Sequence, residues 1–340
     1  MNKKFSLSEY RTYTREQRIP YSLHWTITES CNLRCKHCFI PKTTQRVSLE
    51  DAEWISDFLK EKGFLSIALS GGECLTHPNF KEIYTLLKKK GFLVSVLTNG
   101  TLFSGEIKRL FQEYPPYKVE LSIYGHDEES FYQTTGQKNG VENFLDCLSF
   151  LQKNAIDTLI KAPITKRNYD KLSTFISIAK KHGMQYKFGT YIYASLDGTK
   201  DVLEDRIDVK DFEVVAKQDD SFLKEFANKK REGKISFDEK CGACTNNYIL
   251  NPDNSFSFCA MLMQPKFYFQ KDTLQDAFDK VKDYRKIVQK QYEESPCAKC
   301  KYGALCPSCP AHLKLENDTH LQCANYFLDC IQKFDEMSRG

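Results

Sequence analysis

A short β-rich run followed by an amphipathic segment of helical length recurs from Tyr21 onward, and this alternation constrains the fold most strongly. Such alternation is typical of βα units, in which helices cover a parallel sheet. Six runs are predicted to be strands, at residues 21–28, 65–70, 93–98, 119–123, 158–164 and 185–191. The helices predicted between them cover residues 49–62, 79–90, 106–113, 141–154 and 169–182. We therefore expect an α/β fold built on a parallel sheet.

The segments outside this repeat have a different character. Residues 1–20 are polar and basic and are predicted to be an extended arm. After residue 195 a polar bridge precedes a helix predicted around 211–230 and a hairpin predicted over 248–258. Further helices are predicted over 274–291 and from about Ala324. Ser48 with Asp51 three residues on predicts a capped helix start, and glycines at 63, 91 and 183 predict helix ends.

Composition excludes several classes of partner. The chain has 340 residues, enough for one large domain with an appendage or for two domains. Its net charge of +4 comes from interspersed residues of both signs, so no nucleic-acid partner is predicted. No apolar run could span a bilayer and no secretory signal is present, so we expect a cytoplasmic protein that does not enter a membrane.

The 14 cysteines are an unusually large number and fall mainly into three groups, at residues 31–38, 241–259 and 297–323. In a reducing cytosol, metal ligation explains so many thiols better than disulfides do. Cys31, Cys35 and Cys38 form a C-x3-C-x2-C array directly after the first predicted strand. Three thiolates would leave one iron of a cubane cluster open to a ligand that is not protein.

Distinctive residues also follow the next three predicted strands. Gly71-Gly72-Glu73 comes after the second strand, Asn99-Gly100 after the third, and Ser122 to Gly125 after the fourth. The carboxyl ends of parallel strands meet at one edge of the sheet, where such folds build their ligand sites. We therefore expect these four loops to converge on one site.

The order of these motifs resembles the radical S-adenosylmethionine (SAM) enzymes over residues 21–195. The resemblance implies a partial (β/α)6 TIM-like barrel in which Cys31, Cys35 and Cys38 hold a [4Fe–4S] cluster. SAM would bind the open iron, and an electron from a low-potential donor such as flavodoxin or ferredoxin would cleave it. The resulting 5′-deoxyadenosyl radical abstracts hydrogen from an unactivated C–H bond.

The resemblance further implies SAM-contact roles for six residues near the strand tips: His37, Gly71, Gly72, Glu73, Asn99 and Ser122. The glycines would let the backbone approach the SAM amino group, and Glu73 would accept from that group. His37 would flank the adenine or, alternatively, would simply cover the cluster as a loop residue. Asn99 has an alternative as well, because Asn-Gly stabilises a turn by itself.

The C-terminal cysteines resemble the SPASM extension of radical SAM enzymes, which carries two auxiliary [4Fe–4S] clusters. The resemblance assigns the first cluster to Cys241, Cys244, Cys259 and Cys309, and the second to Cys297, Cys300, Cys306 and Cys323. Asn254 stands where the family usually has glycine, which asparagine can replace because it tolerates a left-handed backbone. Cys330 is near enough in sequence to replace Cys323, while Cys74 and Cys147 are left free.

The resemblances divide the chain into four parts. Residues 1–20 are the arm, 21–195 the radical SAM core, 196–240 a bridging region, and 241–340 the SPASM domain with a β-hairpin, helices and a C-terminal helix. Structural zinc is an alternative for the C-terminal cysteines, because paired C-x2-C elements also form tetrahedral sites.

General similarity favours enzymes that modify a ribosomally made precursor peptide, through a thioether or carbon–carbon crosslink or another residue modification. Sulfatase maturation is disfavoured, because Ala260 stands where those relatives have an aspartate base. A leader peptide would be recognised by a separate protein or by the barrel edge. The alternatives are a SPASM enzyme acting on a metabolite such as a sugar or tetrapyrrole, and a non-enzymatic iron–sulfur or zinc module.

Elemental analysis distinguishes these readings of the cysteines. Three clusters predict about 12 irons per chain, since a cubane contains four, together with matching acid-labile sulfide. Anaerobic reconstitution followed by iron, sulfide and zinc determination checks this. A result of about four irons with zinc bound would contradict the assignment of three clusters.

Overall fold

A nine-stranded sheet organises the protein. The structure is a computed structural model that describes residues 6–219, 223–224 and 235–338. The sheet order is β6-β5-β4-β3-β2-β1-β7-β8-β9. Its first six strands in chain order are β1 (Ser22–Thr28), β2 (Ser66–Gly71), β3 (Leu93–Thr98), β4 (Lys118–Ser122), β5 (Thr158–Pro163) and β6 (Gln185–Gly189). All five neighbouring pairs among these six strands are parallel, which confirms the predicted βα repeat.

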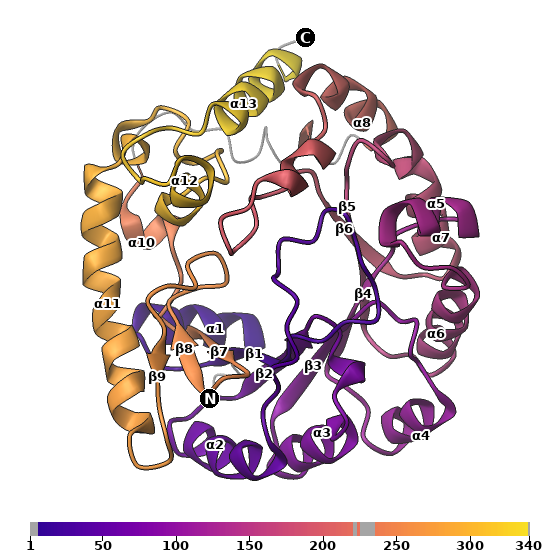
Figure 1. Ribbon diagram of the computed structural model, residues 1–340, viewed down its shortest axis with the longest axis vertical. Coiled ribbons are helices and arrows are strands. Elements are labelled where there is room, and N and C mark those ends of the chain that lie inside the picture. The colour runs from indigo at the N-terminus through magenta and orange to yellow at the C-terminus, as the bar shows by residue number, and fades with distance from the viewer. Residues whose placement is uncertain (1–5, 220–222, 225–234, 339–340) are drawn as a thin grey trace, which may run out of the picture.

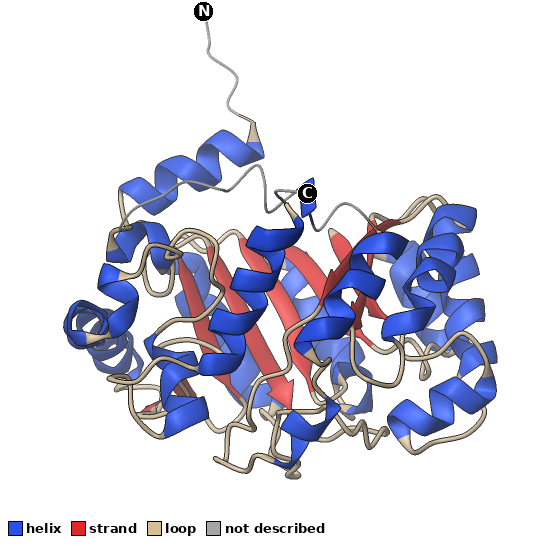
Figure 2. Cartoon of the chain, turned by 90° about the horizontal axis from the view of Figure 1, so that it is seen from above, coloured by secondary structure: helices blue, strands red, loops and turns tan. Residues whose placement is uncertain are grey.

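Helices cover the outside of this curved sheet (Figures 1 and 2). They are α2 (Leu49–Glu61), α3 (Phe80–Lys89), α4 (Gly105–Glu113), α6 (Val141–Lys153) and α7 (Leu172–Lys181), close to the predicted ranges. Burial alternates along β1: Leu23, Trp25 and Ile27 are buried, whereas the residues between them are half-buried. This period of two places one set of side chains in the core beneath the helices and the other set on the inner face of the barrel.

The predicted helix boundaries have the expected chemistry. The Ser48 hydroxyl oxygen accepts from the Asp51 N–H at 2.9 Å and caps α2. Gly63 and Gly91 follow helix ends with φ of +84°, and Gly183 does so with +64°. A left-handed backbone costs glycine little because it has no Cβ, so these glycines stop their helices.

The predicted extended arm is wrong over Leu7–Glu16, which forms helix α1. Ser6 and Glu9 make a reciprocal capping box at its start, a signature that the sequence reasoning overlooked. Tertiary contacts support this helix, since the Asn246 amide donates to the Arg11 carbonyl and to the Thr14 hydroxyl oxygen at 3.1 and 3.0 Å. Three more helices in the described residues were not predicted, α5 (Glu128–Thr135), α10 (Phe237–Lys240) and α12 (Pro310–Asn317).

The C-terminal region continues the sheet. Strand β7 (Asn247–Asn251) pairs in parallel with β1, and β8 (Ser255–Ser257) and β9 (Phe267–Tyr268) follow as antiparallel strands. The β7–β8 pair confirms the predicted hairpin, and Asn254 has the left-handed φ of +53° expected of a glycine substitute. The other helices of the described residues are α8 (Phe212–Gln218), α10 (Phe237–Lys240), α11 (Leu274–Glu294) and α13 (Asn325–Met337).

Helix α8 covers the first part of the helix predicted around 211–230, and most of the remainder lies outside the described residues. Short 3-10 turns occur as η1 (Cys74–Thr76), η2 (Tyr169–Lys171), η3 (Asp201–Asp205), η4 (Val209–Asp211) and η5 (Pro296–Lys299). In the described part of the chain, no helix combines the length and apolar character needed to cross a membrane.

A buried ion pair joins the bridging region to α12. The Arg206 guanidinium contacts both Glu316 carboxylate oxygens, and the two side chains are 11% and 8% exposed. Arg206 Nε also donates to the Ile192 carbonyl at 2.8 Å, and its guanidinium lies 4.4 Å from the Tyr326 ring centroid. Arg206 therefore connects its own segment to the loop at Ile192, to α12 and to α13.

Replacing Arg206 with Met is expected to lower the free energy of unfolding by about 3–5 kcal/mol, because it leaves a buried carboxylate without its partner. Urea denaturation measures this. Lys200→Met is the matched control, since the pair of Lys200 with Asp318 is 44% and 78% exposed and should contribute about 1 kcal/mol at most. Equal losses in the two variants would contradict the importance of the buried pair.

Candidate active site and metal centres

The three cysteines of the N-terminal array lie together in the loop after β1. All three are half-buried. Burial, followed by the charges of Cys38 and Cys31, raises the pKa of the Cys35 thiol to about 12. Thiols that act on one another in this way are close in space. A coordinating thiol is deprotonated outright, so a bound metal would hold Cys35 as a thiolate despite its raised pKa.

Asparagine side chains attach this loop to the tip of β3. Asn32 Nδ2 donates to Thr101 Oγ1 at 2.8 Å, and Asn99 Nδ2 donates to Asn32 Oδ1 at 3.0 Å. Asn99 Oδ1 accepts from the Thr101 N–H at 2.9 Å. The structure thus uses both ends of the Asn99 amide within the protein, in agreement with its turn-stabilising alternative. A contact of Asn99 with SAM stays a prediction.

The two glycines after β2 are required by the cysteine loop itself. A Cβ on Gly71 would lie 2.3 Å from the Thr28 carbonyl oxygen. A Cβ on Gly72 would lie 2.6 Å from the carbonyl oxygens of Glu29 and Ser30 and 2.8 Å from Cys31 Cβ. Distances under 3 Å are essentially never seen for real Cβ atoms. These glycines therefore let the β2 tip pass directly beneath the first thiol, and their proximity to SAM stays a prediction.

Glu73 joins the tips of β2 and β3. Its carboxylate accepts from the Asn99 N–H at 2.7 Å, from Thr98 Oγ1 at 2.8 Å and from the Leu75 N–H at 3.1 Å. It is 2% exposed, and burial raises its pKa while these donors oppose the rise. A carboxylate has about four acceptor positions, so little capacity remains for the SAM amino group.

An aromatic contact joins the cysteine loop to the segment after β4. The His37 ring packs against Tyr124 with centroids 5.5 Å apart, and its Nδ1 has no partner among the described residues. Burial, with smaller contributions from Lys42 and Arg167, lowers the pKa of His37 to about 4, so the ring is neutral at pH 7. His37 is thus a buried loop residue packed on Tyr124, and both alternatives, covering the cluster and contacting adenine, stay predictions.

Sequence reasoning missed Tyr124, although an aromatic residue two positions after Ser122 was a signal. Burial, followed by the charge of Cys35, raises the pKa of its phenol well above the usual value. Tyr124 also forms a side-chain hydrogen bond with Ser122. The Ser122 hydroxyl thus already has a hydrogen-bond partner within the protein, and its contact with SAM stays a prediction.

The C-terminal cysteines are brought together in two sets. In the first auxiliary set, comprising Cys241, Cys244, Cys259 and Cys309, burial and then the Cys309 charge raise the pKa of Cys259 to about 12. Burial, then the charges of Cys259 and Cys241, also raise the pKa of the Cys244 thiol. These four are the residues that the sequence assigned to one cluster.

The second auxiliary set comprises Cys297, Cys300, Cys306 and Cys323. Burial raises the pKa of Cys297 to about 11; Lys240 opposes this, and Cys306 and Cys323 add to it. Burial and then the Cys300 charge raise the pKa of Cys323. Cys330 is instead fully buried on α13, where its thiol contacts the Tyr326 hydroxyl. Burial raises the pKa of Cys330 to about 12 and the Cys306 charge adds to the rise, so a thiol of the second set acts on Cys330 as well. Ligation by Cys323 or by Cys330 stays a prediction.

Cys74 and Cys147 are buried and belong to none of these sets. Cys74 Sγ donates to the Leu97 carbonyl at 3.2 Å, and burial raises its pKa well above the usual value. Such a thiol is inert, as expected from its sequence context.

Cubane clusters and single metal ions make different demands on a set of thiols. Among the described residues, no three His, Cys, Asp or Glu side chains converge closely enough to hold one ion. Ligands of a structural zinc must converge in that way, whereas each thiolate of a cubane binds a different iron. The Ser308 hydroxyl, between Cys306 and Cys309, is also buried without a partner in the described chain, as expected of a donor facing an inorganic sulfide.

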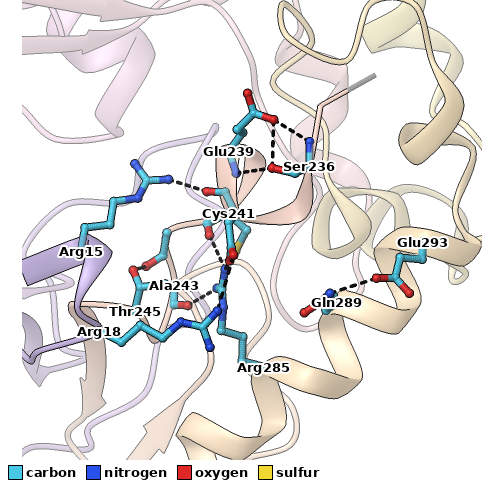
Figure 3. A network of polar contacts seen from close by, with 12 residues as sticks. Arg15, Arg18, Ser236, Glu239, Cys241, Ala243, Thr245, Arg285, Gln289 and Glu293 are labelled. Atoms are coloured by element: carbon cyan, nitrogen blue, oxygen red, sulfur yellow. Dashed lines mark hydrogen bonds and ion pairs between the residues drawn. The ribbon is translucent and has the colours of Figure 1, made fainter. Parts of the chain in front are cut away.

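Cations accompany the thiol sets, and sequence reasoning missed all of them: Lys42 is exposed, Lys240 is half-buried and Arg285 is buried. Lys42 Nζ donates to the Leu33 carbonyl at 3.2 Å in the first loop, and Lys240 Nζ donates to the Gly303 carbonyl at 3.1 Å beside the second auxiliary set. Arg285 on α11 contacts the loop of the first auxiliary set (Figure 3). Its signal was an arginine at an apolar position of the predicted helix over 274–291.

Comparison with known proteins places these features in context. Residues 25–177 match the family model of the Radical SAM superfamily. The antilisterial bacteriocin subtilosin biosynthesis protein AlbA of Bacillus subtilis is 24% identical over 316 residues, which is 88% of this chain and 69% of AlbA. The AdoMet-dependent heme synthase of Methanosarcina barkeri is 29% identical over 168 residues, 48% of each chain.

The fold is similar to that of a solved structure. The crystal structure of Streptococcus suis SuiB bound to precursor peptide SuiA superimposes with a TM-score of 0.70 at 14% identity, over 95% of this chain and 82% of SuiB. At that identity the likeness concerns the fold, including the partial barrel and the C-terminal extension.

The Gly72→Ala variant is expected to lower the free energy of unfolding by about 1–3 kcal/mol, because the added Cβ overlaps the cysteine loop. Iron bound after reconstitution should fall by about four per chain, the content of one cubane. Urea denaturation and iron analysis measure the two effects. Gly189→Ala is the matched control, since a Cβ there meets nothing within 4 Å. Identical behaviour of the two variants would contradict the close-packing argument.

Proposed function

This chain is a radical SAM enzyme, and from that premise we propose that it modifies a ribosomally made precursor peptide at an unactivated carbon. The extent of the match to AlbA carries this proposal, because it covers 88% of the chain and so continues beyond the radical SAM domain at 25–177 into the C-terminal cysteines. SuiB, whose crystal structure contains its precursor peptide SuiA, has the same fold. Both observations support a peptide substrate.

We assign the cofactors by the three thiol sets. Cys31, Cys35 and Cys38 would hold the SAM-binding [4Fe–4S] cluster, and the two C-terminal sets would hold one auxiliary cluster each. When reduced and bound to SAM, the first cluster supplies the electron that yields the 5′-deoxyadenosyl radical. The Asn32–Asn99 contact and the glycines beneath Cys31 keep the open side of that loop at the carboxyl edge of the sheet.

The inner face of the barrel provides the surroundings of the reacting carbon. Lys161 on β5 contacts the Glu120 carboxylate on β4, and their side chains are half-exposed although both strands have neighbours on either side. Burial lowers the pKa of His24 on β1 to about 4, and the charges of Glu120 and Lys161 act on the same ring. We propose that these groups orient a polar part of the substrate below the radical site.

The proposed roles of the parts of the chain use the domain boundaries predicted from the sequence. We propose that residues 21–195 are the radical SAM core, 196–240 a bridge and 241–340 the SPASM domain, with the β1–β7 pairing as their junction. The 14 cysteines fit this arrangement. A low-potential donor such as flavodoxin or ferredoxin would supply electrons, in keeping with a cytoplasmic location. A separate protein or the barrel edge would recognise the leader.

Action on a metabolite is the second candidate. The M. barkeri heme synthase supports it, with 29% identity over 168 residues. That match covers less than half of this chain, so it supports the shared radical chemistry more than a shared substrate. A tetrapyrrole or sugar enzyme would produce 5′-deoxyadenosine without any peptide.

Co-expression with a precursor peptide encoded beside the gene tests the proposal. The expected result is a peptide mass lowered by about 2 Da for each crosslink, since each one removes two hydrogens, with 5′-deoxyadenosine formed only when peptide is present. Mass spectrometry and chromatography measure both. Cys35→Ala should abolish SAM cleavage yet keep about eight irons per chain, the content of two cubanes. Peptide-independent 5′-deoxyadenosine with an unchanged peptide mass would favour the metabolite candidate.

A further inference from the structure

Arg285 is a buried cation at a position where its helix presents apolar residues. On α11 it follows the buried Phe278 and Val281 and precedes Val288 and Tyr292, at the spacing of one helix face. Its exposure is 5%. Burial of a charge is costly unless the surroundings compensate it, so a cation in this apolar stripe requires a specific partner.

The contacts of Arg285 direct it to the loop of the first auxiliary set. Nη1 donates to the Ala243 carbonyl at 2.5 Å, and Nη2 donates to the Cys241 carbonyl at 2.9 Å (Figure 3). On its outer side Nη2 pairs with Asp238, whose side chain is 62% exposed, and one face of the guanidinium lies 4.5 Å from the Phe237 ring centroid. The planar fork is therefore fixed in orientation.

One donor of this fork has no acceptor. The Arg285 Nε–H is buried and makes no hydrogen bond within the described part of the chain. Leaving a buried donor unpaired costs about 1–3 kcal/mol, and more for a charged group. Burial raises the pKa of the neighbouring Cys241 thiol, and the Arg285 charge opposes that rise, which shows that the cation and the sulfur are close. An anionic sulfur ligand or sulfide would satisfy the free donor.

We propose that Arg285 sets the reduction potential of the first auxiliary cluster, through its fixed charge and an Nε–H donated to a cluster sulfur. The inference rests on the proposed function, which assigns a cluster to Cys241, Cys244, Cys259 and Cys309. One-electron reduction adds a negative charge to a centre that four thiolates already make anionic. A buried cation and a hydrogen bond to sulfur both favour that reduction and raise the potential.

The test is a redox titration of the reconstituted full-length protein, followed by electron paramagnetic resonance. Arg285→Met should lower the equilibrium constant for reducing one auxiliary cluster about tenfold, which corresponds to ~59 mV for a one-electron couple. Arg285→Lys retains the charge and loses the Nε donor, so it should give a smaller shift of the same sign. Lys282→Met, which removes a half-exposed cation on the same helix, is the control and should leave the potential unchanged.

Asp238→Asn keeps the inference testable if the buried substitutions impair folding, because Asp238 is largely exposed. Removing its carboxylate leaves the charge of Arg285 less neutralised, so the same cluster should become easier to reduce. Its reduction potential should rise, whereas Arg285→Met should lower it.

Two failures can be told apart. If the wild-type protein lacks auxiliary iron, the cluster assignment in the proposed function is wrong. If iron is complete but neither Arg285→Met nor Asp238→Asn moves an auxiliary potential, the assignment stands and the role of Arg285 is overturned. Shifts of opposite sign in the two variants support it.

Discussion

Parallel pairing of β1 with β2 on one side and with β7 on the other is the constraint on which the rest of the structure depends. Parallel neighbours require crossover connections, so the chain completes the whole barrel before β7 returns to the free edge of β1. The sheet is therefore continuous from the N-terminal core into the cysteine-rich region. The cysteine loop leaves β1 at its carboxyl end and stands in a fixed relation to both halves.

The carboxyl edge is held together by hydrogen bonds that connect one strand tip to the next. Glu73 accepts from Asn99 and Thr98, and Asn99 donates to Asn32 beside the first thiol. The motif residues thus serve the architecture of the site in addition to any contact with SAM. Because the same side chains hold the loop, a substitution among them would alter loop position and cofactor binding together.

Cations lie beside all three thiol sets, exposed at Lys42, half-buried at Lys240 and buried at Arg285. Lys42, Lys240 and Arg285 all place positive charge beside sulfur that, when coordinated, would be negative. Arg206 has a different task, since its charge is matched by Glu316 and it joins the bridging region to α12. A cation near sulfur acts on redox chemistry, whereas a cation paired with a carboxylate contributes to stability.

The sequence by itself determined the βα repeat, the glycine helix ends and the hairpin with left-handed Asn254, because periodicity and turn chemistry are local signals. It did not predict α1, whose polar face obscures the pattern and whose support comes from Asn246, more than 200 residues away. Only the tertiary structure decided that β7 joins β1, that Gly72 lies beneath Cys31 and that Arg285 reaches Cys241. These features depend on contacts between distant segments, which a single sequence does not encode as a local pattern.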